Sequence, residues 1–222
     1  EVTGYSTYYS QNTLTITNVI HTSVTATKNW SDYTDEALIA LYRPESVSVT
    51  LSASDGRVIP DAQKTITGSG SATWDGLDTY ATNGAKIIYT VTEAAVAGYI
   101  TTYQPADGSA DASGNVAITN TINNTDVVVT KNWVDAGYNA LRPDSFELAL
   151  QSGGQTVATQ TVTSAAVANS QQITFAVPRL NAAGEAAVYT VIETAMTYGG
   201  TRIALNGSGF AGGYTGTWSG LT

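Results

Sequence analysis

The sequence repeats itself with a period of about 100 residues, and this repetition restricts the possible fold more than any other feature. Residues 24–30 (VTATKNW) return as residues 127–133 (VVVTKNW), and an Arg-Pro-acid step follows each of them. Residues 87–93 (IIYTVTE) return as residues 187–193 (AVYTVIE) at nearly the same spacing. About 100 residues is the length of one small β-sandwich, so we expect tandem copies of such a domain.

The two ends of the chain are out of phase with this repeat. Residues 14–20 (LTITNVI) resemble residues 116–122 (VAITNTI), the end of the first copy, whereas the second copy runs into a Gly-rich segment without such a strand. We therefore expect residues 1–22 to be N-terminal strands that belong to a preceding or neighbouring repeat. Residues 23–123 form a complete repeat in this interpretation, and residues 124–222 form a second repeat that lacks its last strand.

Composition places the chain in the all-β class and excludes several kinds of partner. Thr, Val, Tyr and Gly are abundant and only 12% of the residues are charged, a pattern that favours strands and turns. The net charge of −9 makes nucleic acid or an anionic membrane surface an unsuitable partner. There is no Cys for disulfides, no apolar run near the roughly 20 residues of a membrane span and no signal peptide, so we expect a mature product or an excised piece.

Three strands of the repeat each carry one polar side chain on a face that is otherwise apolar. Successive side chains of a strand point to opposite faces, so residues two apart share a face. In the first copy the polar members of these apolar faces are Lys28, Glu93 and Asn120. In the second copy Lys131 and Glu193 occupy the matching positions. The pattern predicts that these groups lie in the core.

Buried together, these three groups favour one chemical reaction. Burial disfavours charge, so a buried Lys loses its proton readily and a buried carboxyl group gains one. A neutral amine next to an Asn side chain can attack the carboxamide carbon while the acid transfers protons, and ammonia leaves behind a Lys–Asn isopeptide bond. The alternative is a buried Lys–Glu pair with Asn hydrogen-bonded beside it and no reaction.

The same motifs carry a family resemblance that covers nearly the whole chain. The succession VxxTKNW, RPESVxVxL, YTVTEAAVAGY and ITNTI resembles the Cna B-type (CnaB) repeats of collagen adhesins and pilins on Gram-positive cell surfaces. The resemblance implies tandem β-sandwiches with a reversed immunoglobulin-like fold. It also implies a spontaneous isopeptide bond between Lys28 and Asn120, with Glu93 as proton shuttle. Lys131 and Glu193 match the same motif positions.

The second copy departs from the family because its own Asn is absent, and Asn18 is the residue that can supply it. We expect neighbouring copies or adjacent repeats as partners, with the N-terminal strand of one subunit completing the sheet of the next, so that Asn18 faces Lys131 and Glu193. Such head-to-tail contacts propagate into a filament. The alternative is an arbitrary cut within a longer tandem array, in which case residues 1–22 fold back, pair in a crystal or stay loose.

These features favour an extracellular, structural stalk or fibre module of a cell-surface or cell-wall adhesin or pilus. A crosslink between the first and last strands would resist extension and proteolysis. The alternative is a ligand-binding adhesin module that uses exposed aromatic residues to recognise host protein or carbohydrate; the candidates are Tyr5, Tyr8, Tyr9, Tyr99 and Tyr103.

Other functional signals in the sequence are weak. A turnover enzyme is the least favoured class, because the only His, His21, has no ionisable partner near it in sequence. Residues 107–115 resemble a calcium loop but lack its closing Glu, so we expect a hairpin turn and neither metal nor cofactor. Trp30 and Trp133 are expected to keep the neighbouring Lys dry, and an Asp two residues after each Trp to cap the following loop.

Overall fold

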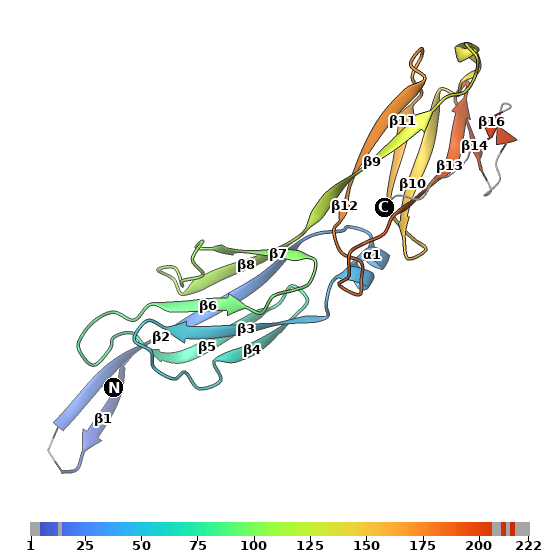
Figure 1. Cartoon of the computed structure of the whole chain (residues 1–222). Coiled ribbons are helices and arrows are strands. Elements are labelled where there is room, and N and C mark those ends of the chain that lie inside the picture. Colours follow the sequence, from blue (N-terminus) through green and yellow to red (C-terminus); the bar gives the residue numbers. More distant parts are fainter. Residues whose placement is uncertain (1–4, 13–14, 206–209, 212–213, 216–222) are drawn as a thin grey trace. The chain divides into compact units, whose positions relative to one another are not determined.

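The computed structural model divides the chain into two compact units, which we call unit 1 (Glu1–Ile122) and unit 2 (Asn123–Thr222) (Figure 1). The residues that it describes are 5–12, 15–205, 210–211 and 214–215. Both units consist almost entirely of strands, which confirms the all-β prediction. The Gly-rich segment after residue 205 lies largely outside the described residues.

Unit 1 is a sandwich of two sheets. The described strands of unit 1 are β1 (Tyr5–Ser10), β2 (Thr15–Ser31), β3 (Ser46–Ala53), β4 (Gln63–Thr67), β5 (Ser71–Asp78), β6 (Tyr89–Glu93), β7 (Tyr99–Gln104) and β8 (Asn115–Ile122). One sheet has the order β4-β3-β6, and the other joins β5, β2, β8 and β7, with β1 on the first part of β2. Buried and more exposed residues alternate along β3 and β8, so each strand turns one face toward the space between the two sheets.

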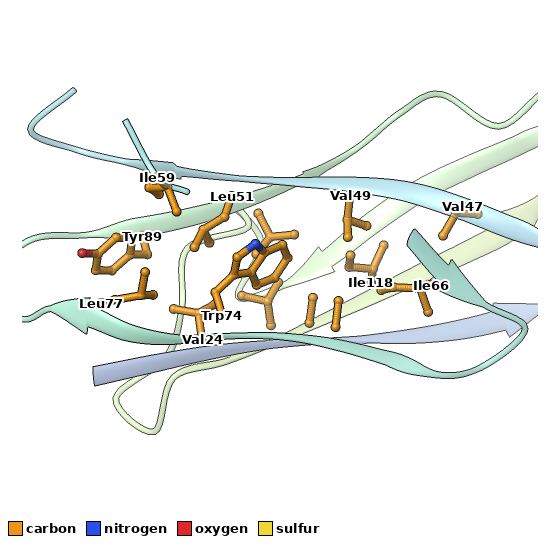
Figure 2. Close-up of a cluster of buried hydrophobic side chains, with 14 of the residues drawn as sticks. Val24, Val47, Val49, Leu51, Ile59, Ile66, Trp74, Leu77, Tyr89 and Ile118 are labelled. Atoms are coloured by element: carbon orange, nitrogen blue, oxygen red, sulfur yellow. The ribbon is translucent and has the colours of Figure 1, made fainter. Parts of the chain in front are cut away.

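The core of unit 1 fills the space between its sheets. Figure 2 shows side chains of the two layers, among them Val24 and Trp74 from one sheet and Val49 and Leu51 from the other. The Trp74 indole nitrogen donates hydrogen bonds to the backbone oxygens of residues 61 and 62, at 3.0 and 3.1 Å. This large buried side chain therefore leaves no polar atom unsatisfied.

The first and last strands of the sandwich lie side by side and run parallel. β2 pairs with β5 on one edge and with β8 on the other. The register places Lys28 opposite Ile118 and Trp30 opposite Asn120. Because paired residues point to the same face, this register brings the Lys and Asn of the sequence pattern to one side of the sheet.

β2 begins in a two-stranded ribbon that extends beyond the sandwich of unit 1 (Figure 1). Its residues Thr15–Ile20 pair antiparallel with β1, and the strand then continues without interruption to Ser31. Residues 5–10 and 15–20 thus pair with each other within this chain, and we call residues 5–12 and 15–20 the N-terminal ribbon.

The loop between β2 and β3 holds a short helix that the all-β interpretation did not include. It is α1 (Glu36–Tyr42), and the Asp35 side chain caps it by accepting hydrogen bonds from the backbone N–H groups of Ala37 and Leu38. The signal was present in the sequence as an Asp followed by an acidic first turn and an apolar run.

Unit 2 repeats the two-layer plan with one difference. Its described elements are β9 (Asn124–Asn132), the 3₁₀ helix η1 (Asn139–Leu141), β10 (Ser145–Ser152), β11 (Gln155–Thr163), β12 (Ser170–Pro178), β13 (Thr190–Tyr198), β14 (Thr201–Ala204), β15 (Phe210–Ala211) and β16 (Tyr214–Thr215). One sheet has the order β11-β10-β13-β14, and the other contains β12 and β9. Within the described residues, β9 has a partner on one edge only, whereas β2 has one on each.

Candidate functional site: a buried lysine, glutamate and asparagine

Unit 1 holds an ion pair with no contact to solvent. Lys28 comes from β2 and Glu93 from the end of β6 in the facing sheet, so the sandwich itself brings them together. Lys28 Nζ lies 3.2 Å from Glu93 Oε1, and neither side chain has any exposed surface. Burial lowers the pKa of Lys28, and the neighbouring Glu93 carboxylate opposes this shift.

The carboxylate of Glu93 is held in position from the last hairpin of the sandwich. Thr101 Oγ1 on β7 donates a 3.0 Å hydrogen bond to Glu93 Oε2. The backbone N–H of Glu93 donates to the Tyr103 hydroxyl, also at 3.0 Å. Neither contact was expected from the sequence. The signal was the spacing of Thr101 and Tyr103 two residues apart, which places both on one face of a strand.

Asn120 completes the buried group from β8. Its side chain is 0% exposed. In the sheet it lies opposite Trp30 of β2 on one side and opposite Thr101 of β7 on the other. Neither its side-chain nitrogen nor its side-chain oxygen has a hydrogen-bond partner. An unsatisfied buried amide costs on the order of 1–3 kcal/mol. Hydrogen bonding among the three groups therefore does not satisfy the carboxamide.

An aromatic and cationic stack covers the amine. Lys28 Nζ lies 4.3 Å from the centroid of the Trp30 ring, and the Arg43 guanidinium lies 5.1 Å from it. Tyr99 packs edge-on against Trp30, and its hydroxyl donates to Asp32 Oδ2 at 3.0 Å. Asp32 also binds Arg43, whose Nε lies 2.9 Å from Oδ2. Trp30, which we expected to keep the amine dry, does lie against it.

Unit 2 builds the same stack. Lys131 Nζ and the Arg142 guanidinium lie 4.6 and 5.2 Å from the centroid of the Trp133 ring. The Arg142 Nε donates to Asp135 Oδ2 at 2.6 Å, and the pKa of Asp135 is lowered mainly by this hydrogen bond. Asp135 also accepts a 3.4 Å hydrogen bond from the backbone N–H of Gly137, as expected of a loop cap. The sequence did not indicate the other partners of Asp32 and Asp135, which are the arginines of the Arg-Pro steps.

The ion pair of unit 2 is less enclosed. Lys131 Nζ donates to Glu193 Oε2 at 2.9 Å, but the Lys131 side chain is 16% exposed where Lys28 is fully buried. Glu193 Oε1 is buried and has no hydrogen-bond partner. No Asn strand lies on the second edge of β9 within the described residues, which explains the difference in exposure.

Asn18 lies on the exposed N-terminal ribbon and not in a core. Its side-chain oxygen accepts a 2.7 Å hydrogen bond from Thr7 Oγ1 of β1. The sequence pattern placed Asn18 on an inward face with Leu14, Ile16 and Ile20, but Ile16 is 64% exposed and Leu14 lies outside the described residues. The physical reason is that, among the residues that the structure describes, no second sheet layer covers this ribbon.

The remaining candidates give no second site. His21 Nδ1 lies 3.4 Å from Asp78 Oδ1, a partner that is distant in sequence, and Asp78 also binds Arg57. The segment at 107–115 forms turns in which Asp107 and Asp111 accept hydrogen bonds from nearby residues. Within the described residues, no group of three or more His, Cys, Asp or Glu side chains is placed to hold a metal ion.

The five candidate tyrosines do not form one exposed platform. Tyr5, Tyr8 and Tyr9 on the N-terminal ribbon are 40%, 58% and 73% exposed. Tyr99 and Tyr103 are only partly exposed, and their hydroxyls are engaged with Asp32 and with the backbone of Glu93. Of these five candidates, only the three on the ribbon are therefore exposed.

Comparison with known proteins decides the family. The model of the Cna protein B-type domain matches residues 24–121 and again residues 127–210. The chain belongs to the Cna protein B-type domain family. This confirms the resemblance inferred from the motifs and the prediction of tandem immunoglobulin-like sandwiches. No curated protein sequence matches the chain.

Solved structures similar to this Cna B-type chain include repeat units of a collagen binding protein and a shaft pilin. Two B repeat units of the collagen binding protein of Staphylococcus aureus are 30% identical, with 87% of this chain and 50% of that chain covered and a TM-score of 0.43. The match thus spans half the length of that two-repeat structure. A shaft pilin of Lactobacillus rhamnosus GG, an E269A mutant, is 15% identical, with 83% and 93% of the two chains covered and a TM-score of 0.32.

The part of the chain that the structure describes contains no helix long and apolar enough to span a membrane.

Proposed function

We propose that this chain is a structural stalk or fibre module of a Gram-positive surface adhesin or pilus, stabilised by a spontaneous isopeptide bond between Lys28 and Asn120. Membership of the Cna protein B-type domain family supports the structural role and the extracellular location at the cell surface or cell wall. Its partners are adjacent repeats or neighbouring copies, with the N-terminal strand of one copy completing unit 2 of the next.

The observation that carries the proposal is the buried carboxamide of Asn120, without a hydrogen-bond partner, on the same face of the sheet as the fully buried Lys28–Glu93 ion pair. Proton transfer from the Lys28 ammonium to Glu93 leaves a neutral amine and a neutral acid, which a site closed to solvent favours over two charges. The amine then attacks Asn120 Cγ while the Glu93 acid polarises the side-chain oxygen. Trp30 and Arg43 exclude water from the amine and so keep it nucleophilic.

The reaction balances without any cofactor. The Lys28 Nζ–Asn120 Cγ bond forms, the Asn120 Cγ–Nδ2 bond breaks, and Glu93 passes a proton to the departing nitrogen, which leaves as ammonia. Glu93 is regenerated, but Lys28 and Asn120 are consumed, so each chain reacts once. The new amide bond also ends the cost of leaving the carboxamide nitrogen unsatisfied in the core.

The position of the bond explains its mechanical use. β2 enters the sandwich and β8 leaves it, and the two strands lie side by side with Lys28 and Asn120 near their C-terminal ends. Force applied along the chain would pass from Lys28 directly to Asn120. The roughly 90 residues between them would bear no load, and about 300 Å of chain extension would be withheld.

Single-molecule pulling on the full chain tests this role. We expect no unfolding step of about 300 Å from unit 1 in the wild type, and such a step in the Asn120→Ala variant. The same substitution at Asn115, an exposed residue of the same strand, is the matched control and should behave as wild type. Unit 2 has no Lys–Asn bond of its own in this proposal and should unfold in a step of similar length in every variant, so two such steps in the wild type would contradict the proposal.

A further inference from the structure

The N-terminal ribbon duplicates, pair for pair, the hairpin that carries Asn120. In the ribbon, β1 and β2 place Tyr5 opposite Ile20, Thr7 opposite Asn18 and Tyr9 opposite Ile16. In unit 1, β7 and β8 place Tyr99 opposite Ile122, Thr101 opposite Asn120 and Tyr103 opposite Ile118. All six positions carry the same residue types. The ribbon is therefore a preformed copy of the two strands that close the unit 1 site.

The two hairpins differ in what covers them. Ile118 and Asn120 are fully buried in unit 1, whereas their counterparts Ile16 and Asn18 are exposed, Ile16 by 64%. Tyr9 is 73% exposed, and its counterpart Tyr103 is partly buried. A concentrated set of exposed aromatic and aliphatic side chains marks an interaction surface. The ribbon thus exposes the residues that its copy uses to complete a core.

Unit 2 presents the complementary surface. The second edge of β9 has no partner strand within the described residues, and Lys131 on this strand is partly exposed. Val127 is partly exposed too, although its counterpart Val24 is 1% exposed. Glu193 Oε1 is buried without a partner, and the Thr101 hydroxyl fills the corresponding role beside Glu93 in unit 1.

We propose that the whole N-terminal ribbon of one copy docks on β9 in a second copy, at the edge that has no partner strand within the described residues, and becomes covalently joined to it. Transfer of the β2–β8 register places Ile16 opposite Lys131 and Asn18 opposite Trp133, with the two strands parallel. Thr7, on the second strand of the ribbon, then turns from Asn18 to the carboxylate of Glu193, as Thr101 does with Glu93.

The covalent step rests on the proposed function, because it uses the same chemistry. Lys131 passes a proton to Glu193, its neutral amine attacks Asn18 Cγ, the Asn18 Cγ–Nδ2 bond breaks and ammonia leaves with a proton returned by Glu193. No other reactant is needed. The joint is heterologous, since ribbon and β9 are different surfaces, so successive copies extend into a fibre.

The path of the chain is compatible with such a joint. After the ribbon, β2 continues without a break into the first strand of its own sandwich. After Asn120, β8 is followed by β9 with only Asn123 between them. A docked ribbon would therefore connect two copies in the same way that β8 and β9 connect units 1 and 2 within one chain.

A complementation experiment with full-length chains tests the proposal. Asn18→Ala removes the carboxamide that Lys131 attacks, and Lys131→Arg keeps a cation beside Glu193 but removes the reactive amine. Each variant alone should remain monomeric under denaturing conditions, the wild type should form a ladder, and a mixture of the two variants should form a covalent dimer that stops there. Asn12→Ala, an exposed Asn on the same ribbon, is the matched control and should form the ladder.

Intact masses separate this proposal from the proposed function. Each joint should lose one ammonia in addition to the ammonia lost at Lys28–Asn120. Monomers that lose one ammonia but form no dimer in the mixture would overturn the ribbon joint alone. A wild-type monomer that loses two ammonias would place the ribbon on unit 2 of its own chain and overturn the choice of partner. No loss at all would overturn both proposals.

Discussion

Replacing Asn120 by Ala should lower the stability of unit 1 far more than the loss of one small side chain would. The substitution removes the acceptor of the isopeptide bond and leaves the Lys28–Glu93 ion pair in place. The bond closes a loop of roughly 90 residues, and a crosslink of that span restricts the unfolded chain by about 4–5 kcal/mol in the entropic treatment. The free energy of unfolding of unit 1 is therefore expected to fall by about this amount in the variant.

Scanning calorimetry of the full chain measures the loss, with unit 2 as internal reference. A change of 1 kcal/mol shifts the melting temperature of a domain of this size by about 4–8 °C, so the unit 1 transition should fall by roughly 16–40 °C. The unit 2 transition should stay in place. Asn115→Ala should leave both transitions unchanged, because this side chain is exposed. A unit 1 transition within about 5 °C of wild type would refute the crosslink.

Three further outcomes are expected from the structure. Gly114→Ala should lower the free energy of unfolding by about 1–3 kcal/mol more than Gly84→Ala in denaturant titrations. Both residues have a φ of +82°, but only a Cβ at position 114 would meet a backbone oxygen of β2, at 2.3 Å. Equal losses would contradict this close approach to β2. In the Asn120→Ala variant Lys28 keeps its amine, and burial lowers the pKa of that amine in the folded state. Between the folded pKa and the ordinary lysine pKa of 10.5 the unfolded state binds more protons, so the free energy of unfolding should rise with pH in that range. Adding Lys28→Met should abolish this slope in unfolding measured as a function of pH. The pKa of Asp135 is lowered in the folded state, so its contribution to the stability of unit 2 is present above its unfolded pKa and is lost as the pH falls through its folded pKa. Asp135→Asn should therefore lower the melting temperature of unit 2 at neutral pH and make that temperature less sensitive to acid.

The sequence was sufficient for the repeat, the all-β class and the faces of the main strands. Lys28 and Asn120 were each placed in the core by alternation alone, and both are fully buried. This worked because one face of each strand must be apolar, so a polar exception stands out. The contact between Lys28 and Glu93 could not be predicted in this way, because it depends on how the two sheets face each other, which alternation does not specify.

Other parts of the site depend on contacts that no local pattern encodes. Arg43 reaches back 11 residues to Asp32 and stacks over Trp30, and the sequence showed only that these residue types recur in both copies. The sequence already matched residues 14–20 with residues 116–122, but the match of both strands, pair for pair, needed the register of β1 on β2. Tyr and Thr at alternate positions are common in strands, so their spacing alone did not indicate a duplicate.

The most direct test of the central claim is the intact mass of the purified full chain under denaturing conditions, followed by peptide mapping of the crosslink. For the monomer, measured in the Asn18→Ala background that prevents joints between copies, we expect a mass lower by one ammonia than the sequence mass and a branched peptide that joins Lys28 to Asn120. Adding Asn120→Ala or Glu93→Ala in this background should restore the full sequence mass. A wild-type monomer with its full sequence mass would contradict the account, because Lys28, Glu93 and Asn120 would then be a buried cluster without a reaction.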